Sequence, residues 1–259
     1  LRLILGDQLN ASHSWFKDKD PDTLYLIAEL RQETDYVVHH VQKICAFFAA
    51  MQQFAQALSS AGFNVLHLDL DDTQAFDDLP HLLSILIDTH HIQQFEYQLP
   101  DEYRLRQQLA DFSAGLVIAS SSVSAEHFYL ADQELPKHFS AGKKHRMEAF
   151  YRTMRKRFAI LMDGDGNPEG GAWNYDANNR NKLKANDLAG VPKPLLFAND
   201  VTEVLARLER HQIKTIGRAD TSLLWPINRQ QAKELLDYFC RYGLPLFGSF
   251  QDAMTSQLN

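Results

Sequence analysis

Residues 1–10 read L-R-L-I-L-G-D-Q-L-N, and this stretch decides the fold class. Leucine and isoleucine dominate residues 1–5, and Gly6 ends the run. A short apolar run of this kind is typical of a strand that is buried on both faces, in the middle of a parallel sheet. Ligands of open α/β sheets bind just past the carboxyl ends of central strands, where Asp7 and Gln8 would lie. The alternative is that Gly6 and Asp7 form only a turn that caps a short helix.

The rest of the first half alternates between strand and helix patterns. A long helix is expected to begin at Thr34 or Asp35 and to end before Gly62. Alternation of this kind predicts an α/β fold with a doubly wound, five-stranded parallel sheet, Rossmann-like, in the order 3-2-1-4-5. The four further strands are expected over residues 23–29, 63–70, 92–98 and 115–120, and two further helices over 79–90 and 101–112.

Composition limits the class of protein. The chain has 259 residues, 45% of them hydrophobic, which suffices for one large domain or two. The net charge of −7 argues against a surface coated by nucleic acid, although it leaves a local basic patch possible. Two cysteines, Cys45 and Cys240, form neither a disulfide framework nor a metal motif. The apolar runs are too short for a membrane span and no signal peptide is recognised, so we expect a cytoplasmic protein.

The strand pattern fades after about residue 131. A helix is predicted over residues 145–162, and a glycine- and asparagine-rich stretch follows over 163–195. Two more helices are predicted over 199–211 and 228–242. The predicted organisation is therefore an α/β domain over 1–131, an interdomain helix and linker over 132–195, and the start of a helical domain over 196–259.

A local reversal of charge marks the predicted interdomain helix. Seven lysines and arginines lie between Lys143 and Arg157, with Glu148 as the only acid. This face could contact phosphates, or it could be a solvated helix face whose ion pairs reach the acidic loops. Asp163 begins a pattern like that of a calcium loop, but Pro168 and Asn174 stand where glycine and glutamate are required, so no metal site is predicted.

Acidic side chains follow the two strands that should flank the first one. Glu29 and Glu33 come after the second strand, and Glu102 and Tyr103 come after the fourth. Together with Asp7 and Gln8 they would meet at one edge of the sheet. Such a set suits a small, neutral ring that forms many hydrogen bonds better than it suits a phosphate.

Five motifs resemble those of one family. They are similar to motifs of the deoxyribodipyrimidine photolyase-related proteins, which include bacterial iron–sulfur cryptochromes and 6-4 photolyases. The motifs are G-D-Q-L (6–9), D-Y-V-V-H-H-V-Q-K-I (35–44), F-Y-R-T-M-R-K (150–156), G-G-A-W-N-Y-D-A-N-N-R (170–180) and F-G-S-F-Q-D-A-M (247–254).

The resemblance implies a light-dependent DNA-repair flavoprotein of the photolyase (lyase) type. Asp7, Gln8, Glu33 and Glu102 match positions of the pocket for an antenna chromophore, typically a ribityl-lumazine. Arg180 matches a position near the DNA lesion, and Arg152 and Arg155 would contact damaged DNA from the basic helix. The family also holds FAD and an iron–sulfur cluster in a helical domain.

The chain departs from the family in length. Family members are about twice as long, and the regions for FAD and for the four cluster cysteines lie beyond Asn259. We therefore expect the N-terminal antenna portion, inactive in repair by itself. A non-catalytic Rossmann-like module for a small ligand or a partner is the alternative. The apolar faces of the last two helices are expected to pack on the α/β domain, to self-associate or to stay exposed. They comprise Val204, Leu205, Leu208, Leu235, Leu236 and Phe239.

Overall fold

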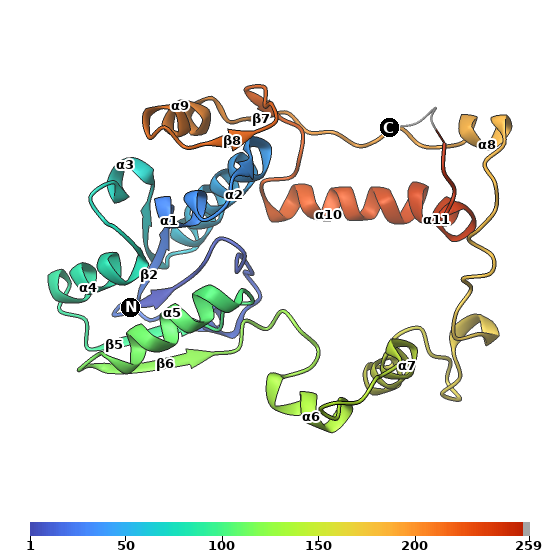
Figure 1. Cartoon of the computed structure of the whole chain (residues 1–259), viewed down its shortest axis with the longest axis horizontal. Helices are drawn as coiled ribbons and strands as arrows, with labels where there is room; N and C mark the ends of the chain where they lie inside the picture. Colours follow the sequence, from blue (N-terminus) through green and yellow to red (C-terminus); the bar gives the residue numbers. More distant parts are fainter. Residues whose placement is uncertain (256–259) are drawn as a thin grey trace. The chain divides into compact units, whose positions relative to one another are not determined.

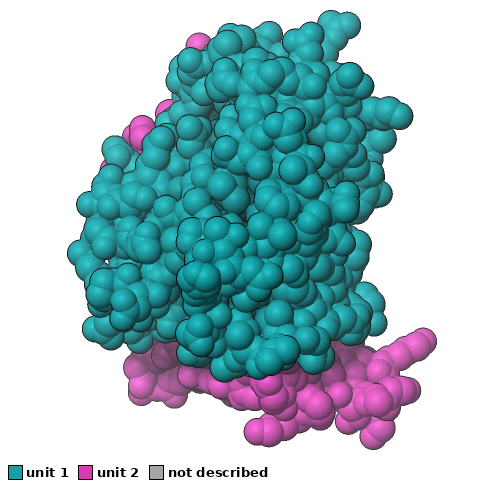
Figure 2. Space-filling view, turned by 90° about the vertical axis from the view of Figure 1, so that its left-hand side faces the viewer, with its two compact units in different colours: residues 1–126, 196–233 teal, residues 127–195, 234–259 magenta. Residues whose placement is uncertain are grey.

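The structure, a computed structural model, describes residues 1–255 (Figure 1). The chain divides into two compact units, coloured teal and magenta in Figure 2. Unit 1 comprises residues 1–126 and 196–233, and unit 2 comprises 127–195 and 234–259. The chain thus leaves the sheet-bearing unit, returns to it and leaves again. The three domains expected from the sequence stay a prediction, because compactness alone does not establish independent folding.

Unit 1 is built on a five-stranded sheet. Its order is β4-β2-β1-β5-β6, and every pairing is parallel. Numbered along the chain, these strands follow the order 3-2-1-4-5, so the predicted doubly wound α/β fold is confirmed. The strands are β1 (Arg2–Leu3), β2 (Leu24–Ala28), β4 (Asn64–Leu68), β5 (Gln94–Gln98) and β6 (Ala119–Val123).

The first strand lies in the centre of the sheet, as its apolar sequence predicts. Arg2 lies opposite Tyr25 of β2 on one side and Glu96 of β5 on the other. Beyond the two residues of β1 the backbone still bonds, because the Ile4 N–H donates to the Leu26 carbonyl at 2.9 Å. Both faces of the strand are covered, which explains why Leu3 and Ile4 are buried.

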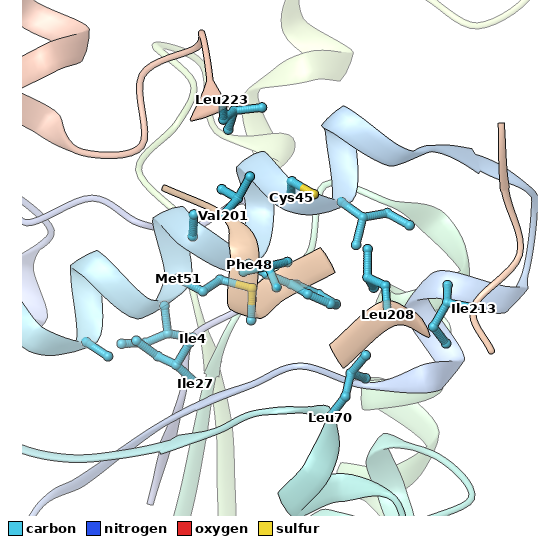
Figure 3. Packing of buried hydrophobic residues seen from close by; sticks show 14 of the residues in the cluster. Ile4, Ile27, Cys45, Phe48, Met51, Leu70, Val201, Leu208, Ile213 and Leu223 are labelled. Carbon is cyan, nitrogen blue, oxygen red and sulfur yellow. The ribbon is translucent and has the colours of Figure 1, made fainter. Parts of the chain in front are cut away.

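Helices cover the two faces of the sheet with separate apolar clusters. One cluster joins β1 and β2 to α2 and α9, and Figure 3 shows Phe48 and Met51 of α2 among its buried side chains. The other joins the opposite face to α4 and α5 through Leu82, Leu83 and Leu109. The helices of unit 1 are α1 (Arg31–Asp35), α2 (Val41–Ser60), α3 (Leu70–Thr73), α4 (Leu79–Thr89), α5 (Tyr103–Ala114) and α9 (Thr202–Arg210), and α10 (Arg229–Tyr238) begins there.

Two boundaries predicted from the sequence were wrong. The helix expected from Thr34 or Asp35 is two helices, because His39–His40 form strand β3, which pairs with β8 (Thr215–Ile216). The His40 ring then caps α2 by accepting the Gln42 N–H at 3.2 Å. The fifth strand, expected over 115–120, is β6 (Ala119–Val123), and its serines pair with β5. Pairing with a neighbouring strand overrides the apolar pattern at this edge of the sheet.

A buried ion pair attaches α9 to the sheet. The Arg207 side chain donates to Glu29, after β2, at 2.9 Å and to Asp69, after β4, at 3.2 Å. Glu29 and Arg207 are both buried. One helical turn away, Arg210 contacts Asp71 at 2.6 Å, but that pair is exposed. Val204 and Leu208 of α9 are buried in the cluster with α2, so this half of the predicted apolar faces packs on the α/β unit.

Unit 2 is mostly irregular. It contains α6 (Leu135–His138), α7 (Met147–Phe158), α8 (Ala185–Ala189), the end of α10, a π-helical turn over Phe239–Gly243 and α11 (Leu244–Phe250). The side chains of Leu236 and Phe239 are exposed there. The self-association expected from such exposed apolar faces stays a prediction.

Two short strands, β7 (Asn199–Asp200) and β9 (Ser222–Leu223), pair in unit 1. Within residues 1–255 no helix is both long and apolar enough to cross a membrane.

Removing the buried cation should destabilise unit 1. In Arg207→Ala the Glu29 carboxyl would lose its buried partner, and we expect the free energy of unfolding to fall by roughly 3–5 kcal/mol. Arg210→Ala, on the same helix but in an exposed pair, is the matched control and should change it much less. Urea unfolding followed by tryptophan fluorescence measures both. Equal losses in the two variants would contradict the role given to Arg207.

Candidate functional site

Unit 1 contains a cavity of about 220 Å³ at the carboxyl ends of β1 and β2. This is the edge at which the sequence predicts ligand binding, because the order of the strands reverses between β1 and β5. The walls combine apolar side chains with a few charged ones. The polar and charged residues lining it are Asp7, Glu29, Glu33, Thr34, His39, Lys43, Glu102 and Arg104, and Tyr36 lies among the aromatic residues.

One wall of the cavity is a stripe of side chains on α2. Lys43, Phe47 and Met51 are spaced four residues apart, so they lie on one face of the helix. Gly6 faces this wall closely, since a Cβ atom there would lie 3.0 Å from the Met51 sulfur and 3.2 Å from a Phe47 ring carbon. The glycine therefore sets the width of the cavity next to the end of β1.

Asp7 and Gln8 have different places. Asp7 lines the cavity, as predicted. Gln8 does not, because its buried side chain accepts the Leu5 N–H at 3.0 Å and donates to the Gln98 carbonyl at 3.2 Å. The Gln8 amide thus joins the ends of β1 and β5 and supports the floor of the site. Its predicted contact with a ligand stays a prediction.

Glu33 lies in the cavity beside a cation that the sequence analysis did not single out. The Arg104 Nη2 atom donates to both oxygens of Glu33, at 2.8 and 3.1 Å. Next to this pair, the amides of Gln32 and Gln108 hydrogen-bond each other at 2.9 and 3.0 Å. These contacts join α1, after β2, to α5, after β5, and so close the site across the end of β1.

Glu102 borders the site as the N-cap residue of α5. Its carboxylate accepts the N–H groups of Arg104 and Leu105, both at 2.8 Å. Partial burial alone would raise the pKa of Glu102, but these two N–H donors outweigh it and lower the pKa. The carboxylate is therefore ionised at neutral pH. Both of its oxygens already accept hydrogen bonds from the backbone.

Glu29 lies where the cavity meets the ion pair with α9. Its carboxylate accepts the Leu70 N–H at 3.1 Å and pairs with Arg207. Burial of the carboxyl group raises the pKa of Glu29 to about 7, against the opposing attraction of Arg207. Glu29 therefore exchanges a proton near neutral pH in the folded protein.

Tyr36, Lys43 and Arg104 are the site residues that sequence reasoning missed. Lys43 has a signal in the sequence, because it shares the helical spacing of Phe47 and Met51. Tyr36 stands in the motif at 35–44 but was not singled out there, and Arg104 has no such signal, since the contact between the two depends on how α1 and α5 approach each other. The Arg104 guanidinium carbon lies 4.6 Å from the centre of the Tyr36 ring.

The residues of this chain do not fit an iron–sulfur cluster. A cluster of the common type needs four thiolates, and the chain has two cysteines. Cys45 is buried in the apolar cluster on α2, where burial raises the pKa of its thiol to about 11. Within residues 1–255 no group of three or more His, Cys, Asp or Glu side chains could hold a metal ion.

The basic residues of α7 lie in unit 2, and most of them have partners. Arg152 pairs with Glu148, and Arg157 pairs with Glu134 at 2.8 Å. Arg155 is buried and donates to the carbonyls of Ile160 and Leu161. Contacts with carboxylates therefore reduce the charge of this face, while Lys143, Lys144, Arg146 and Lys156 remain exposed.

Trp173 of the motif at 170–180 packs against the same helix. Its ring centre lies 5.3 Å from the Arg152 guanidinium carbon, 5.4 Å from that of Arg155 and 5.4 Å from the Lys156 ammonium. Cations at these distances interact favourably with the face of an indole ring. Arg180, at the end of the motif, is exposed and lies 3.5 Å from Asp252. The DNA contacts predicted for Arg152, Arg155 and Arg180 stay predictions.

Comparison with known proteins settles the family. The model of the deoxyribodipyrimidine photo-lyase-related protein family matches residues 2–224. The chain belongs to this family. A (6-4) photolyase of Agrobacterium fabrum is 34% identical over 259 residues, which cover 98% of this chain and 50% of that protein. An uncharacterized protein of Acanthamoeba polyphaga mimivirus is 26% identical over 175 residues, which cover 63% of this chain and 86% of that protein.

The comparisons confirm the resemblance that the five motifs indicate. The chain spans about half the length of the (6-4) photolyase it matches, whereas the match to the mimivirus protein covers 86% of that protein.

The raised pKa of Glu29 predicts a pH dependence of stability. The folded state holds this proton up to about pH 7, whereas the unfolded chain releases it near its usual pKa of 4.5. The contribution of Glu29 is therefore fully present below pH 4.5 and is lost as the pH rises through 7. Urea unfolding of the wild type and of Glu29→Gln, whose side chain stays neutral like the protonated carboxyl, should give curves that diverge as the pH rises, because only the wild type loses stability across this range. Parallel curves would contradict the assignment.

Proposed function

We propose that this chain is the N-terminal, chromophore-binding portion of a light-dependent DNA-repair protein of the photolyase and cryptochrome type. The observation that carries the proposal is the cavity at the carboxyl edge of the sheet, where Asp7, Glu33 and Glu102 lie near an apolar wall. Family membership supports it, as does the name of the Agrobacterium relative.

The proposed ligand is a ribityl-lumazine-type antenna chromophore. The cavity, about 220 Å³, suits a fused ring better than a whole dinucleotide such as FAD. Phe47 and Met51 offer apolar surface to the faces of a ring, and the carboxylates accept hydrogen bonds from its N–H and hydroxyl groups. When bound, such a chromophore absorbs light and passes the excitation energy to a flavin. We place FAD and the iron–sulfur cluster in a region of the full-length protein outside this chain.

Damaged DNA is the proposed substrate of the full-length protein. Support comes from the exposed lysines and arginine at 143–146 and 156 and from the name of the photolyase relative. Phosphate contacts made by such side chains are electrostatic and largely independent of sequence. The chain alone is expected to bind DNA weakly and not to repair it, because repair needs the electron of a reduced flavin.

Chromophore binding should depend on Glu33. We expect 6,7-dimethyl-8-ribityllumazine to bind the 259-residue chain with a change in its fluorescence. Glu33→Ala should weaken binding by about tenfold or more, because a charge-assisted hydrogen bond is lost. Glu96→Ala is the matched control, since Glu96 also pairs with an arginine, at 2.7 Å, but lies outside the cavity. A wild-type chain that binds no lumazine would refute the proposed function.

DNA binding should depend on salt. For a double-stranded oligonucleotide with an ultraviolet lesion, log K should fall linearly with log salt concentration. Replacing Lys143 and Lys144 with Gln should lower the slope by about 0.9 for each phosphate contact removed. Lys17→Gln with Lys19→Gln makes the same change of charge in unit 1 and should leave the slope unchanged. Affinity that is independent of salt, or equal effects of the two double variants, would contradict the proposal.

A further inference from the structure

An exposed surface of unit 1 lies where β3 pairs with β8, at the start of α2 (Figure 1). His40 of β3 stands opposite Ile216 of β8, and both side chains are exposed. The Gln42 side chain, in the first turn of α2, donates to the Arg218 carbonyl at 3.1 Å and accepts the Trp225 indole N–H at 3.4 Å. These contacts bring Ile216, Arg218 and Trp225 to the same end of α2.

Large apolar side chains gather on this surface. Ile216 is 57% exposed and Trp225 is 51% exposed. Val38, 54% exposed, precedes β3 by one residue, so the alternation of an extended chain places it on the same side as His40. Single exposed apolar residues are ordinary, whereas a group of them marks an interaction site. We call this surface the β8 face, and it comprises Val38, His40, Lys214, Ile216, Arg218 and Trp225.

Polar contacts hold the backbone of the β8 face in place. The His40 ring is fixed because it caps α2, where it accepts the Gln42 N–H. Gly217 passes so close to this ring that a Cβ atom there would lie 1.9 Å from its Nε2 atom, and its φ of +79° suits only glycine. The apolar side chains are therefore presented on an ordered surface, which loses little conformational freedom when a partner binds.

The β8 face is also basic, although the chain as a whole has a net charge of −7. Residues 213–226 contain Lys214 and Arg218, both exposed, and Asp220 is the only acid among them. Residues 36–43, on the β3 side, contain no acid. A two-fold contact with a second copy would bring these cations together, and like charges oppose such a contact. A partner with acidic side chains is complementary to this face.

We propose that the β8 face docks an amphipathic helix of a partner protein. The apolar stripe of the helix covers Ile216 and Trp225, and flanking Asp or Glu side chains pair with Lys214 and Arg218. A helix suits this face better than an added strand, because β3 and β8 have two residues each and offer few backbone groups for pairing. Nucleic acid suits it less, since Val38 and Ile216 provide no ring on which a base can stack.

This inference is separate from the proposed antenna function. Ile216 and Trp225 lie outside the set of residues that lines the cavity, as do the two cations of the face. Variants of the β8 face should therefore leave the binding of 6,7-dimethyl-8-ribityllumazine unchanged. Failure of either proposal can then be recognised without reference to the other.

The first test uses two fluorescein-labelled helical peptides of about 18 residues, each with leucine at i, i+3, i+4 and i+7 along one face. One peptide carries glutamate beside this stripe and the other carries lysine. Fluorescence anisotropy with the full 259-residue chain should give a Kd at least about tenfold lower for the acidic peptide. Raising the salt concentration should reduce this difference, because salt screens exposed charges.

The apolar part of the face is tested with Ile216→Asp. This variant should raise the Kd of the acidic peptide at least about tenfold, because a carboxylate then stands under the apolar stripe. Ile85→Asp is the matched control, since Ile85 is 43% exposed on α4, which packs on the other face of the sheet. It should keep the wild-type Kd, and thermal unfolding shows that both variants are folded.

The basic part is tested with Lys214→Glu combined with Arg218→Glu. This double variant should reverse the preference, so that the lysine peptide binds more tightly than the glutamate peptide. Lys17→Glu with Lys19→Glu makes the same change of charge elsewhere in unit 1 and should preserve the wild-type preference.

Other occupants of the β8 face give different results. Absence of peptide binding, equal binding of the two peptides, or a Kd that Ile216→Asp leaves unchanged would overturn the proposal. Labelled oligothymidine that binds in place of the peptides, and is released by Ile216→Asp, would identify a nucleic-acid surface instead. A dimer in sedimentation that dissociates in Ile216→Asp but persists in Ile85→Asp would identify a second copy as the occupant, which also contradicts the proposed partner.

Discussion

Hydrogen bonding of β1 on both sides is the constraint on which the rest of unit 1 depends. Because both its neighbours are parallel to it, the carboxyl ends of β2, β1 and β5 meet at one edge of the sheet. The segments that follow these ends carry Glu33, Asp7 and Glu102, so the cavity receives its carboxylates from three separate stretches of chain. The buried sides of the strand then require helices on both faces, which the two apolar clusters provide.

Two ion pairs between separate elements help to shape this edge. Glu33 and Glu29 each depend on an arginine from another element, Arg104 of α5 and Arg207 of α9. The two pairs differ in burial, since the side chains of Glu33 and Arg104 are both 35% exposed whereas Arg207 is 6% exposed and Glu29 is fully covered. The more accessible pair borders the cavity, while the covered pair fixes the position of α9.

The sequence predicts the sheet well and the site in part. Apolar runs and their order suffice for strand order, since right-handed crossovers leave few alternatives. The bounds of β6 and of α2 could not be predicted from the sequence. The serines of β6 belong to the strand because they pair with β5, and β3 interrupts the expected helix because it pairs with residues 215–216. Asp7, Glu33 and Glu102 were identified from strand ends alone. Gln8, Tyr36 and Arg104 acquire their places from contacts distant in sequence, which no local pattern encodes.

The division of unit 1 between two stretches of chain has a consequence for biosynthesis. A ribosome completes residues 1–126 before it adds 196–233, so the nascent sheet at first lacks α9. During that interval the partners of Val204 and Leu208 on α2 are uncovered, and Glu29 has no Arg207 beside it. Synthesis from the N-terminus thus exposes an apolar surface for the time needed to add the intervening residues. Chaperones that recognise apolar surfaces can bind the nascent chain during this interval.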